Sequence, residues 1–344
     1  MRFGLFGSAQ ADAADQRHGR GFHDYADFNV EAEALGFHST FLVEHHFSGW
    51  SQVSATLTLL TWLAARTTTL RLGTATLVLP WHNPVLLAEQ AATLDLLSGG
   101  RVDFGVGKGY RHNEFAGFSI PIEEAEPRFD EALTVILRAW TTAGRFSHNG
   151  RFWRFEDIAV EPLPAQKPHP PVWMAAGSPR AIRRVAERGA NLLLDQFAPP
   201  QLIGERIALF RAEVRARGRT FDPLQVAVAR DVFVAEDPAE KAAALRRRAE
   251  VNRRTVAVSR APGGSGGSHI LSYADAPGGT EASALYGTAD EVIEGLRALE
   301  AVGVRYVLMN IGGGSRESLR RIARDVLPQF AGANATRAGG GDAL

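Results

Sequence analysis

Short apolar segments of β type alternate with amphipathic helical patterns along almost the whole chain, and this alternation constrains the fold more than any other feature. Eight such segments are present: Arg2–Phe6, Ser39–Glu44, Leu70–Leu79, Arg101–Gly107, Pro171–Gly177, Asn191–Phe197, Leu224–Ala235 and Val304–Ile311. Strands that alternate with helices run parallel, because each helix returns the chain to the same end of the sheet. The sequence therefore predicts an α/β protein whose parallel sheet is covered by helices.

Eight strand–helix units are the number that closes a (β/α)8 TIM barrel. A doubly wound open sheet is the alternative, because strand count alone does not distinguish the two. Such a barrel usually takes about 250 residues, whereas this chain has 344. We predict a single barrel domain over residues 1–330, with the additional residues in insertions.

Three segments account for the excess length. Ala143–His169, after the fourth unit, contains HNGRFWRFEDIAVEPLP and is predicted to be a hairpin insertion. Ser259–Gly279, after the seventh strand and its helix, is rich in Gly and Ser, which predicts a mobile loop. The tail Ala331–Leu344 is rich in Gly and poor in large apolar residues, which predicts disorder.

Charge and cysteine content exclude several classes of function. Lys and Arg together number 38, as do Asp and Glu, so the net charge gives no reason to expect binding to nucleic acid or an anionic membrane. The absence of cysteine excludes disulfides, thiolate metal sites and a cysteine nucleophile, and it fits a reducing cytoplasm. The N-terminal apolar run is too short for a signal peptide, and polar or proline residues interrupt the charge-free stretches Phe47–Ala65 and Leu72–Ala88. We expect a soluble, cytoplasmic protein.

A glutamate and two histidines follow the second predicted strand in the segment FLVEHHFSGW, residues 41–50. In a barrel, the residues that follow the strands form the active-site mouth. Neighbouring strand residues point to opposite faces, so His45 and His46 cannot easily bind one metal ion, and Glu44 with His46 provides too few ligands. Two interpretations remain: a hydrogen-bonded structural pair, or one histidine that faces the mouth as an acid, a base or a hydrogen-bond donor.

The segment GVGKGYRHNEF, residues 105–115, could bind a phosphate after the fourth strand. Its glycines allow the backbone to approach a ligand closely, and Lys108 offers a cation. Tyr110 interrupts the GxGxxG spacing, so a dinucleotide fingerprint is not supported. A glycine-rich turn with a solvated lysine is the alternative.

A second phosphate candidate is AAGSPRAIRRVAERG, residues 175–189. Gly177 ends a strand, Ser178 is a favourable helix N-cap, and Pro179 occupies the first helical position. The free amides of the following turn would point at an anion, and the helix dipole would favour it. An ordinary well-capped helix is the alternative.

Taken together, these motifs resemble those of the bacterial luciferase-like flavin monooxygenases. The matching segments keep their order and spacing over roughly residues 1–330. They are MRFGLF at the start, EHHF after the second strand, LGTATLVLPWHNP at the third, LDLLSGGRVDFGVGKGY at the fourth and PVWMAAGSP at the fifth. Each segment is weak alone, whereas the combination is specific.

The resemblance implies a (β/α)8 barrel that binds FMN at its C-terminal mouth. It makes His45 the catalytic histidine and places a non-proline cis peptide at Ala75–Thr76, against which the flavin ring rests. It assigns the FMN phosphate to Lys108 and to the backbone at the start of the helix that Ser178 caps. The cofactor-binding residues implied in this way are Phe6, Ala75, Thr76, Lys108, Tyr110, Ala175, Ala176, Gly177 and Ser178, with no metal.

The implied activity is that of an FMN-dependent monooxygenase that receives reduced FMN from a separate flavin reductase. Oxygen would add to the reduced flavin, and the resulting flavin peroxide would oxidise an aldehyde, a ketone or an activated carbon. The Gly/Ser-rich loop would be the mobile lid of the family. Family members are commonly homodimers that pack through the early helices, which makes the charge-poor helix Ser51–Ala65 a candidate interface.

Three departures from the family pattern bear on these expectations. Lys108 stands where an arginine often serves, which puts bidentate phosphate binding in doubt. Gly177 replaces an acidic residue of luciferase and Gln196 an aromatic one, so light emission with long-chain aldehydes does not follow. Some family members use a deazaflavin and transfer hydride, and a flavin-binding protein without turnover is a third alternative. The intact EHHF favours FMN and catalysis over both.

Overall fold

The computed structural model describes residues 1–10, 20–259, 283–311 and 315–333. Eight parallel strands form a closed ring, in the order β1 (Arg2–Gly7), β2 (Ser39–Leu42), β3 (Arg71–Thr74), β5 (Val102–Gly107), β8 (Val172–Ala175), β9 (Asn191–Leu194), β10 (Val226–Val234) and β12 (Tyr306–Ile311). Pairing of β9 with β10 and of β12 with β1 closes the ring. This closure confirms the TIM barrel and excludes the open sheet.

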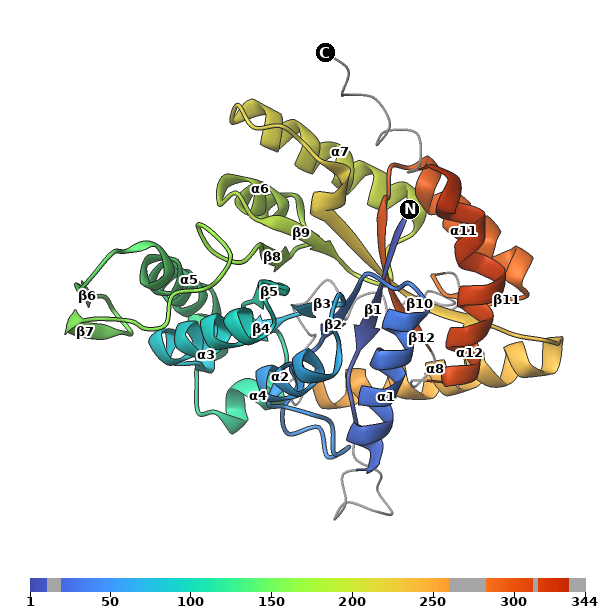
Figure 1. The fold of residues 1–344 in the computed structure, drawn as a ribbon, viewed down its shortest axis with the longest axis horizontal. Coiled ribbons are helices and arrows are strands. Elements are labelled where there is room, and N and C mark those ends of the chain that lie inside the picture. The colour runs from blue at the N-terminus through green and yellow to red at the C-terminus, as the bar shows by residue number, and fades with distance from the viewer. Residues whose placement is uncertain (11–19, 260–282, 312–314, 334–344) are drawn as a thin grey trace.

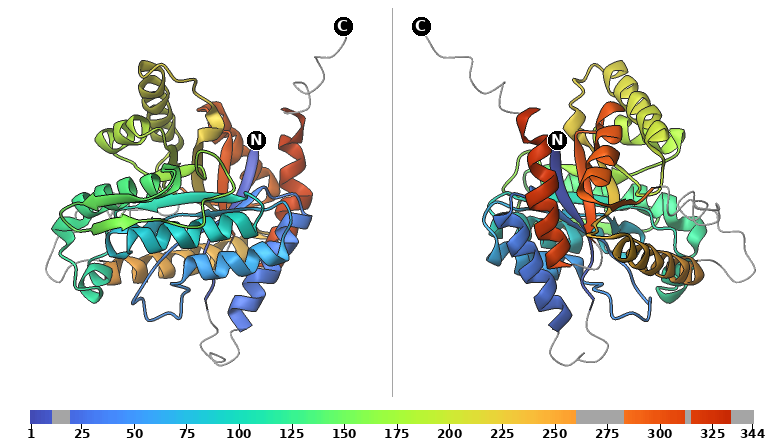
Figure 2. Two further views of the ribbon diagram at one scale, coloured as in Figure 1. Left: turned by 60° about the vertical axis from the view of Figure 1, so that its left-hand side comes forward. Right: turned by 90° about the vertical axis from the view of Figure 1, so that its right-hand side faces the viewer.

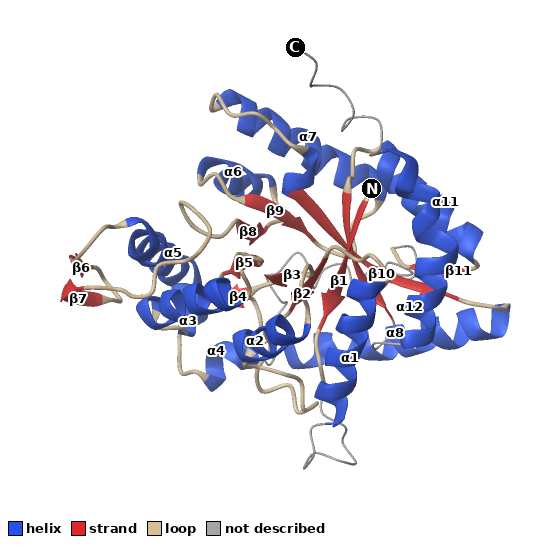
Figure 3. Cartoon of the chain, viewed as in Figure 1, coloured by secondary structure: helices blue, strands red, loops and turns tan. Residues whose placement is uncertain are grey.

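Helices surround the ring of strands, which lies in the middle of Figure 3. They are α1 (Arg20–Ala34), α2 (Thr56–Arg66), α3 (Pro84–Leu97), α4 (His112–Gly117), α5 (Ala125–Thr141), α6 (Pro179–Glu187), α7 (Pro200–Ala216), α8 (Pro238–Ser259), α11 (Ala289–Ala301) and α12 (Arg316–Arg321). The first and last helices lie side by side (Figure 2), and Glu31 of α1 pairs with Arg316 of α12 at 2.6 Å. Within the described ranges, no helix combines the length and the apolar character needed to cross a membrane.

The third strand differs most from its prediction. The segment Leu70–Leu79 was expected to be one strand, but it is divided into β3 and β4 (Leu77–Val78), with a short 3-10 helix after them. A cis peptide between Ala75 and Thr76 separates the two strands, as the family resemblance implied. The small residues of this segment therefore mark an interruption of the barrel wall.

A short strand that the sequence did not indicate, β11 (Leu285–Gly287), pairs with the last three residues of β10. The first residues of β10 pair with β9 instead. The C-terminal part of β10 thus extends past its neighbour in the ring, and α8 begins four residues after it ends.

The predicted hairpin insertion is present as β6 (Phe146–Asn149) and β7 (Arg154–Ile158), an antiparallel pair that projects from α5 at the left of Figure 1. The carboxylate of Glu131 on α5 holds the turn, because it accepts hydrogen bonds from the backbone of Arg151, Phe152 and Trp153. The predicted loop Ser259–Gly279 lies outside the described residues, apart from Ser259 at the end of α8.

The remaining boundaries differ by a few residues. The first three residues of the predicted tail, which was expected to begin at Ala331, belong to a 3-10 helix over Leu327–Ala333, and its other residues lie outside the described ranges. The helix predicted over Ser51–Ala65 begins only at Thr56. It buries Leu59, Leu60 and Leu63 in the chain's own core, so burial within one chain accounts for its apolar sequence. The homodimer stays a prediction.

Large aromatic side chains fill the interior of the barrel below its mouth. Phe41, Trp173 and Tyr306 meet edge to face, with ring centroids 5.7 to 6.4 Å apart. The indole of Trp173 donates to Asp103 at 3.1 Å, and Asp103 also pairs with Arg71 at 2.7 Å. These side chains fill the interior at the amino ends of the strands, whereas the larger cavity among the described residues lies at the carboxyl ends.

Candidate functional site

A cavity of about 1240 Å³ occupies the carboxyl end of the barrel, with α8 along one side. Barrel active sites lie at this end of the strands. The volume exceeds the roughly 300–1,000 Å³ that is usual for small-molecule sites. Of the predicted site residues, Phe6, His45, Ala75, Thr76, Lys108, Tyr110, Ala175 and Ala176 line this cavity, whereas Gly177 and Ser178 do not.

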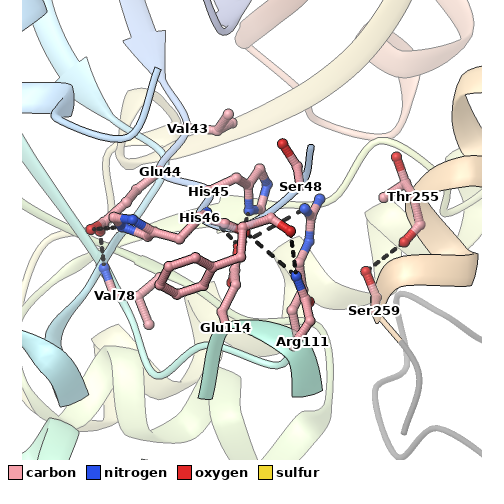
Figure 4. A network of polar contacts seen from close by, with 12 residues as sticks. Val43, Glu44, His45, His46, Ser48, Val78, Arg111, Glu114, Thr255 and Ser259 are labelled. Atoms are coloured by element: carbon pink, nitrogen blue, oxygen red, sulfur yellow. Dashed lines mark hydrogen bonds and ion pairs between the residues drawn. The ribbon is translucent and has the colours of Figure 1, made fainter. Parts of the chain in front are cut away.

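His45 lines the cavity and is held by a carboxylate from α4. Its Nδ1 lies 3.0 Å from Oε1 of Glu114, which is almost fully buried (Figure 4). Burial of the imidazole lowers the pKa of His45 below its ordinary value, and the nearby charge of Arg111 adds to the effect. His45 is therefore neutral at pH 7. An Nδ1–H that donates to Glu114 leaves the lone pair on Nε2, so the ring can accept a proton there.

His46 points away from His45 and does not line the cavity. Its Nε2 lies 2.9 Å from Oε1 of Glu44, and its ring packs edge-on against Trp81 and Phe118. Of the two interpretations, the structure has one histidine at the cavity and the other hydrogen-bonded away from it. Both rings lie beyond β2, which ends at Leu42, so the predicted strand Ser39–Glu44 was two residues too long.

Glu44 is a buried acceptor of four hydrogen bonds. Besides His46, its carboxylate accepts from the backbone of Val78 at 2.7 Å, from the indole of Trp81 at 3.2 Å and from His82 at 2.7 Å. Burial raises the pKa of this carboxyl, but the hydrogen bonds from His46 and His82 outweigh burial and lower the pKa to about 2. Glu44 therefore stays ionised and ties β2 to the segment that follows the cis peptide.

The floor of the cavity depends on a close approach of two chain segments. A Cβ at Gly107 would lie 2.4 Å from Oγ1 of Thr76, and a Cβ at Gly105 would lie 1.7 Å from the carbonyl oxygen of Thr74. Only glycine leaves room for the third and fourth strands at these positions. The glycines of GVGKG thus pack the barrel here, and a phosphate contact is not needed to explain them.

Lys108 and the start of α6 meet at one carboxylate. Nζ of Lys108 lies 3.4 Å from Glu126, and Arg180 in the first turn of α6 lies 3.2 Å from the same group. Ser178 caps this helix by accepting from the backbone of Ala181 at 3.3 Å, as predicted. The structure therefore brings the two predicted phosphate-binding segments together. It adds Arg180, which the sequence interpretation did not single out.

Two other residues at the site were missed. Glu114 and Arg111 belong to the segment GVGKGYRHNEF, of which the sequence analysis used only the glycines, Lys108 and Tyr110. Their signal is a carboxylate and a guanidinium in the turn that follows a barrel strand, where polar residues reach the mouth. Their partner, His45, lies 69 residues away from Glu114 in the sequence, and no local pattern shows that contact.

A family model described as luciferase-like monooxygenase matches residues 1–306. The chain belongs to the luciferase-like monooxygenase family. In sequence it is 26% identical to the oxygenase component of a flavin-dependent trigonelline monooxygenase from Acinetobacter baylyi, over 96% of each chain. In structure it resembles the monooxygenase RslO1 from Streptomyces bottropensis, with a TM-score of 0.83, 26% identity and coverage of 96% of this chain and 100% of RslO1.

An F420-dependent enzyme is also among the proteins that resemble this chain. An F420-dependent glucose-6-phosphate dehydrogenase from Kineococcus radiotolerans is 30% identical over 62% of this chain and 65% of the relative. The chain spans 60% of the length of another relative, the uncharacterized protein y4vJ of Sinorhizobium fredii, to which it is 31% identical over 61% of its own length.

Glu44 generates a prediction about stability. Replacing Glu44 with Gln should lower the free energy of unfolding at pH 7 by about 1.5–3 kcal/mol, because hydrogen bonds to a charged acceptor are lost. The control Glu205→Gln, on the exposed face of α7, should change it by less than about 0.5 kcal/mol. Urea unfolding followed by circular dichroism measures both variants.

The native protein and Glu44→Gln also test how stability depends on pH. The pKa of Glu44 is lower in the folded chain than the ordinary 4.5. Its contribution is thus complete above that pH and is lost as the pH falls towards 2. The advantage of the native protein over Glu44→Gln should therefore shrink through this window. An advantage that stays constant at acid pH would contradict the assignment.

Proposed function

We propose that this protein is an FMN-dependent monooxygenase, which uses reduced FMN and molecular oxygen to oxidise a small organic substrate such as an aldehyde, a ketone or an activated carbon. The observation that carries the proposal is the pair of His45 and Glu114: a neutral imidazole on the cavity wall, oriented by a buried carboxylate. The separate source of reduced FMN is inferred from the trigonelline relative, which is named as an oxygenase component.

The residues present fit a flavin. The cavity is large enough for a ring system together with a substrate, and small residues at Ala75, Thr76 and Gly107 leave its floor flat. At the other end, the cations Lys108 and Arg180 lie beside the capped start of α6, an arrangement that favours a phosphate. Phe6, Tyr110, Ala175 and Ala176 would line the space between the two ends. Bound reduced FMN would supply the electrons that activate oxygen.

The chain itself would contribute orientation, proton transfer and exclusion of water. Glu114 fixes the tautomer of His45, so that Nε2 can take a proton from the substrate. α8 lines one side of the cavity, where it would reduce contact between the reacting groups and bulk water. The chain would therefore supply the base, while the cofactor would supply the redox chemistry.

The second candidate function is a deazaflavin-dependent dehydrogenase, which the F420-dependent relative favours. Titration of the apoprotein with FMN and separately with F420 distinguishes the two. We expect FMN to bind more tightly and the FMN-loaded, reduced protein to consume oxygen. Tighter binding of F420, with hydride transfer and no oxygen uptake, would establish the dehydrogenase instead. FMN binding without any turnover would indicate a flavin-binding protein.

Lys108 tests the placement of the phosphate. Lys108→Ala should weaken FMN binding by about 1.5 kcal/mol, the low end for a charged hydrogen bond, because this side chain is 57% exposed and already pairs with Glu126. Riboflavin lacks the phosphate and should bind equally to the native protein and the variant. Fluorescence titration measures both ligands, and an unchanged FMN affinity would reject the assignment.

The two histidines test the catalytic assignment. Once a panel of aldehydes and ketones yields a substrate, His45→Ala should lose about 10²–10⁴-fold in product formation, the usual range for general acid–base catalysis. More of the consumed oxygen should then appear as hydrogen peroxide. His46→Ala should lower the melting temperature instead, since its bond to Glu44 is lost. If instead His46→Ala forms less product per oxygen consumed and His45→Ala does not, the two histidines have the opposite roles.

A further inference from the structure

Arg111 is a buried cation whose guanidinium is only partly paired, by a long ion pair with Glu114 and by the ring of Tyr110 at 5.9 Å. It lines the cavity, yet only 4% of the residue is exposed. Among the described residues, Nε and Nη1 of its guanidinium have no hydrogen-bond partner. The nearest carboxylate oxygen, Oε1 of Glu114, lies 3.9 Å from Nη1 and already meets His45 and the backbone N–H of His46 at 3.0 Å.

Two other buried arginines, Arg248 and Arg230, donate hydrogen bonds to partners in the chain. Arg248 also lines the cavity, but its Nε donates to Asp231 at 2.7 Å. Arg230 donates to the backbone carbonyls of Asp195 and Ala198 at 2.9 and 2.6 Å. An arginine keeps its charge in proteins, and a buried charge without full hydrogen bonding is costly. The incomplete pairing of the Arg111 guanidinium therefore points to a partner that enters from the cavity.

The position of Arg111 indicates which ligand group that partner carries. Arg111 and His45 approach the same oxygen of Glu114, so an anion bound to Arg111 lies next to the proposed catalytic histidine (Figure 4). The proposed phosphate site differs, because Lys108 and Arg180 turn towards Glu126 instead. A planar guanidinium matches the two oxygens of a carboxylate in a bidentate pair.

We propose that Arg111 binds the carboxylate of an anionic substrate and holds the oxidisable carbon beside His45. The inference rests on the proposed function and narrows its substrate class to carboxylic acids. The role of Arg111 is substrate positioning. It also explains why a charge that disfavours protonation of His45 lies so close to it: a bound carboxylate would neutralise that charge when the substrate is present.

Benzoate and its neutral analogue benzamide test this inference by isothermal titration of the protein, both loaded with FMN and free of it. Benzoate should bind at least about tenfold more tightly than benzamide, the effect of one charge-assisted contact. Arg111→Gln should weaken benzoate about tenfold or more and leave benzamide unchanged. Arg254→Gln, which removes an exposed cation from the same cavity, should leave benzoate affinity within about twofold.

Several results would overturn the inference. The inference fails if benzoate and benzamide bind with equal affinity, or if Arg111→Gln binds benzoate as tightly as the native protein does. It also fails if Arg254→Gln loses as much benzoate affinity as Arg111→Gln. Weaker binding of FMN but not of riboflavin by Arg111→Gln would assign the side chain to the cofactor phosphate. The titration without FMN measures benzoate binding even if the protein does not bind FMN. Failure to bind FMN would therefore contradict the proposed function without affecting the test of Arg111.

The variant Arg111→Met distinguishes substrate binding from a structural role, because it removes the charge and keeps the length of the side chain. If Arg111 waits for a ligand, the melting temperature without benzoate should fall by less than about 3 °C. Benzoate should then raise the melting temperature of the native protein and not that of the variant. A large fall without ligand would show that Arg111 holds the fold, and it would contradict the proposal.

Discussion

Two buried carboxylates hold the segment after β2 in place, and the geometry of the mouth depends on them. Glu44 binds the segment to the chain beyond the cis peptide, through Val78, Trp81 and His82. Glu114 binds it to α4, through His45 and the backbone of His46. Each carboxylate is enclosed, so each hydrogen bond acts in a medium of low polarity, where loss of a partner is costly. His45 and His46 therefore lie in different environments, although they are adjacent in the sequence.

The barrel divides into a packed end and a hollow end. Aromatic rings fill the amino end, and Asp103 anchors one of them through a buried hydrogen bond. Towards the carboxyl end, small residues such as Ala75, Gly107 and Ala175 line the cavity, and the third strand is interrupted at Ala75–Thr76. Packing and the cavity therefore occupy different layers of the same sheet.

Much of the fold could be predicted because it depends on local pattern. The eight strands follow from apolar runs between helices. The two histidines lie beyond the end of β2 at Leu42, so strand alternation does not account for the separation of their rings. The presence of β11 could not be predicted, since a strand of three residues has no periodicity of its own. For the third strand, apolar pattern predicted one continuous strand, and only the family resemblance indicated the cis peptide at which it is divided. Glu114 and Arg111 were missed for another reason: their meaning arises from contacts with a segment that lies far away in the chain.

The length of β10 has a consequence for how such enzymes diversify. Its first residues complete the barrel against β9, whereas its last three pair with β11 outside the ring. The helix that lines the cavity, α8, starts from this overhang and contacts α4 across the mouth. Residues can therefore be added to or removed from α8 without shifting the register of any strand that carries the proposed base. The wall of the cavity that α8 forms can thus vary separately from the segments that hold His45 and Arg111.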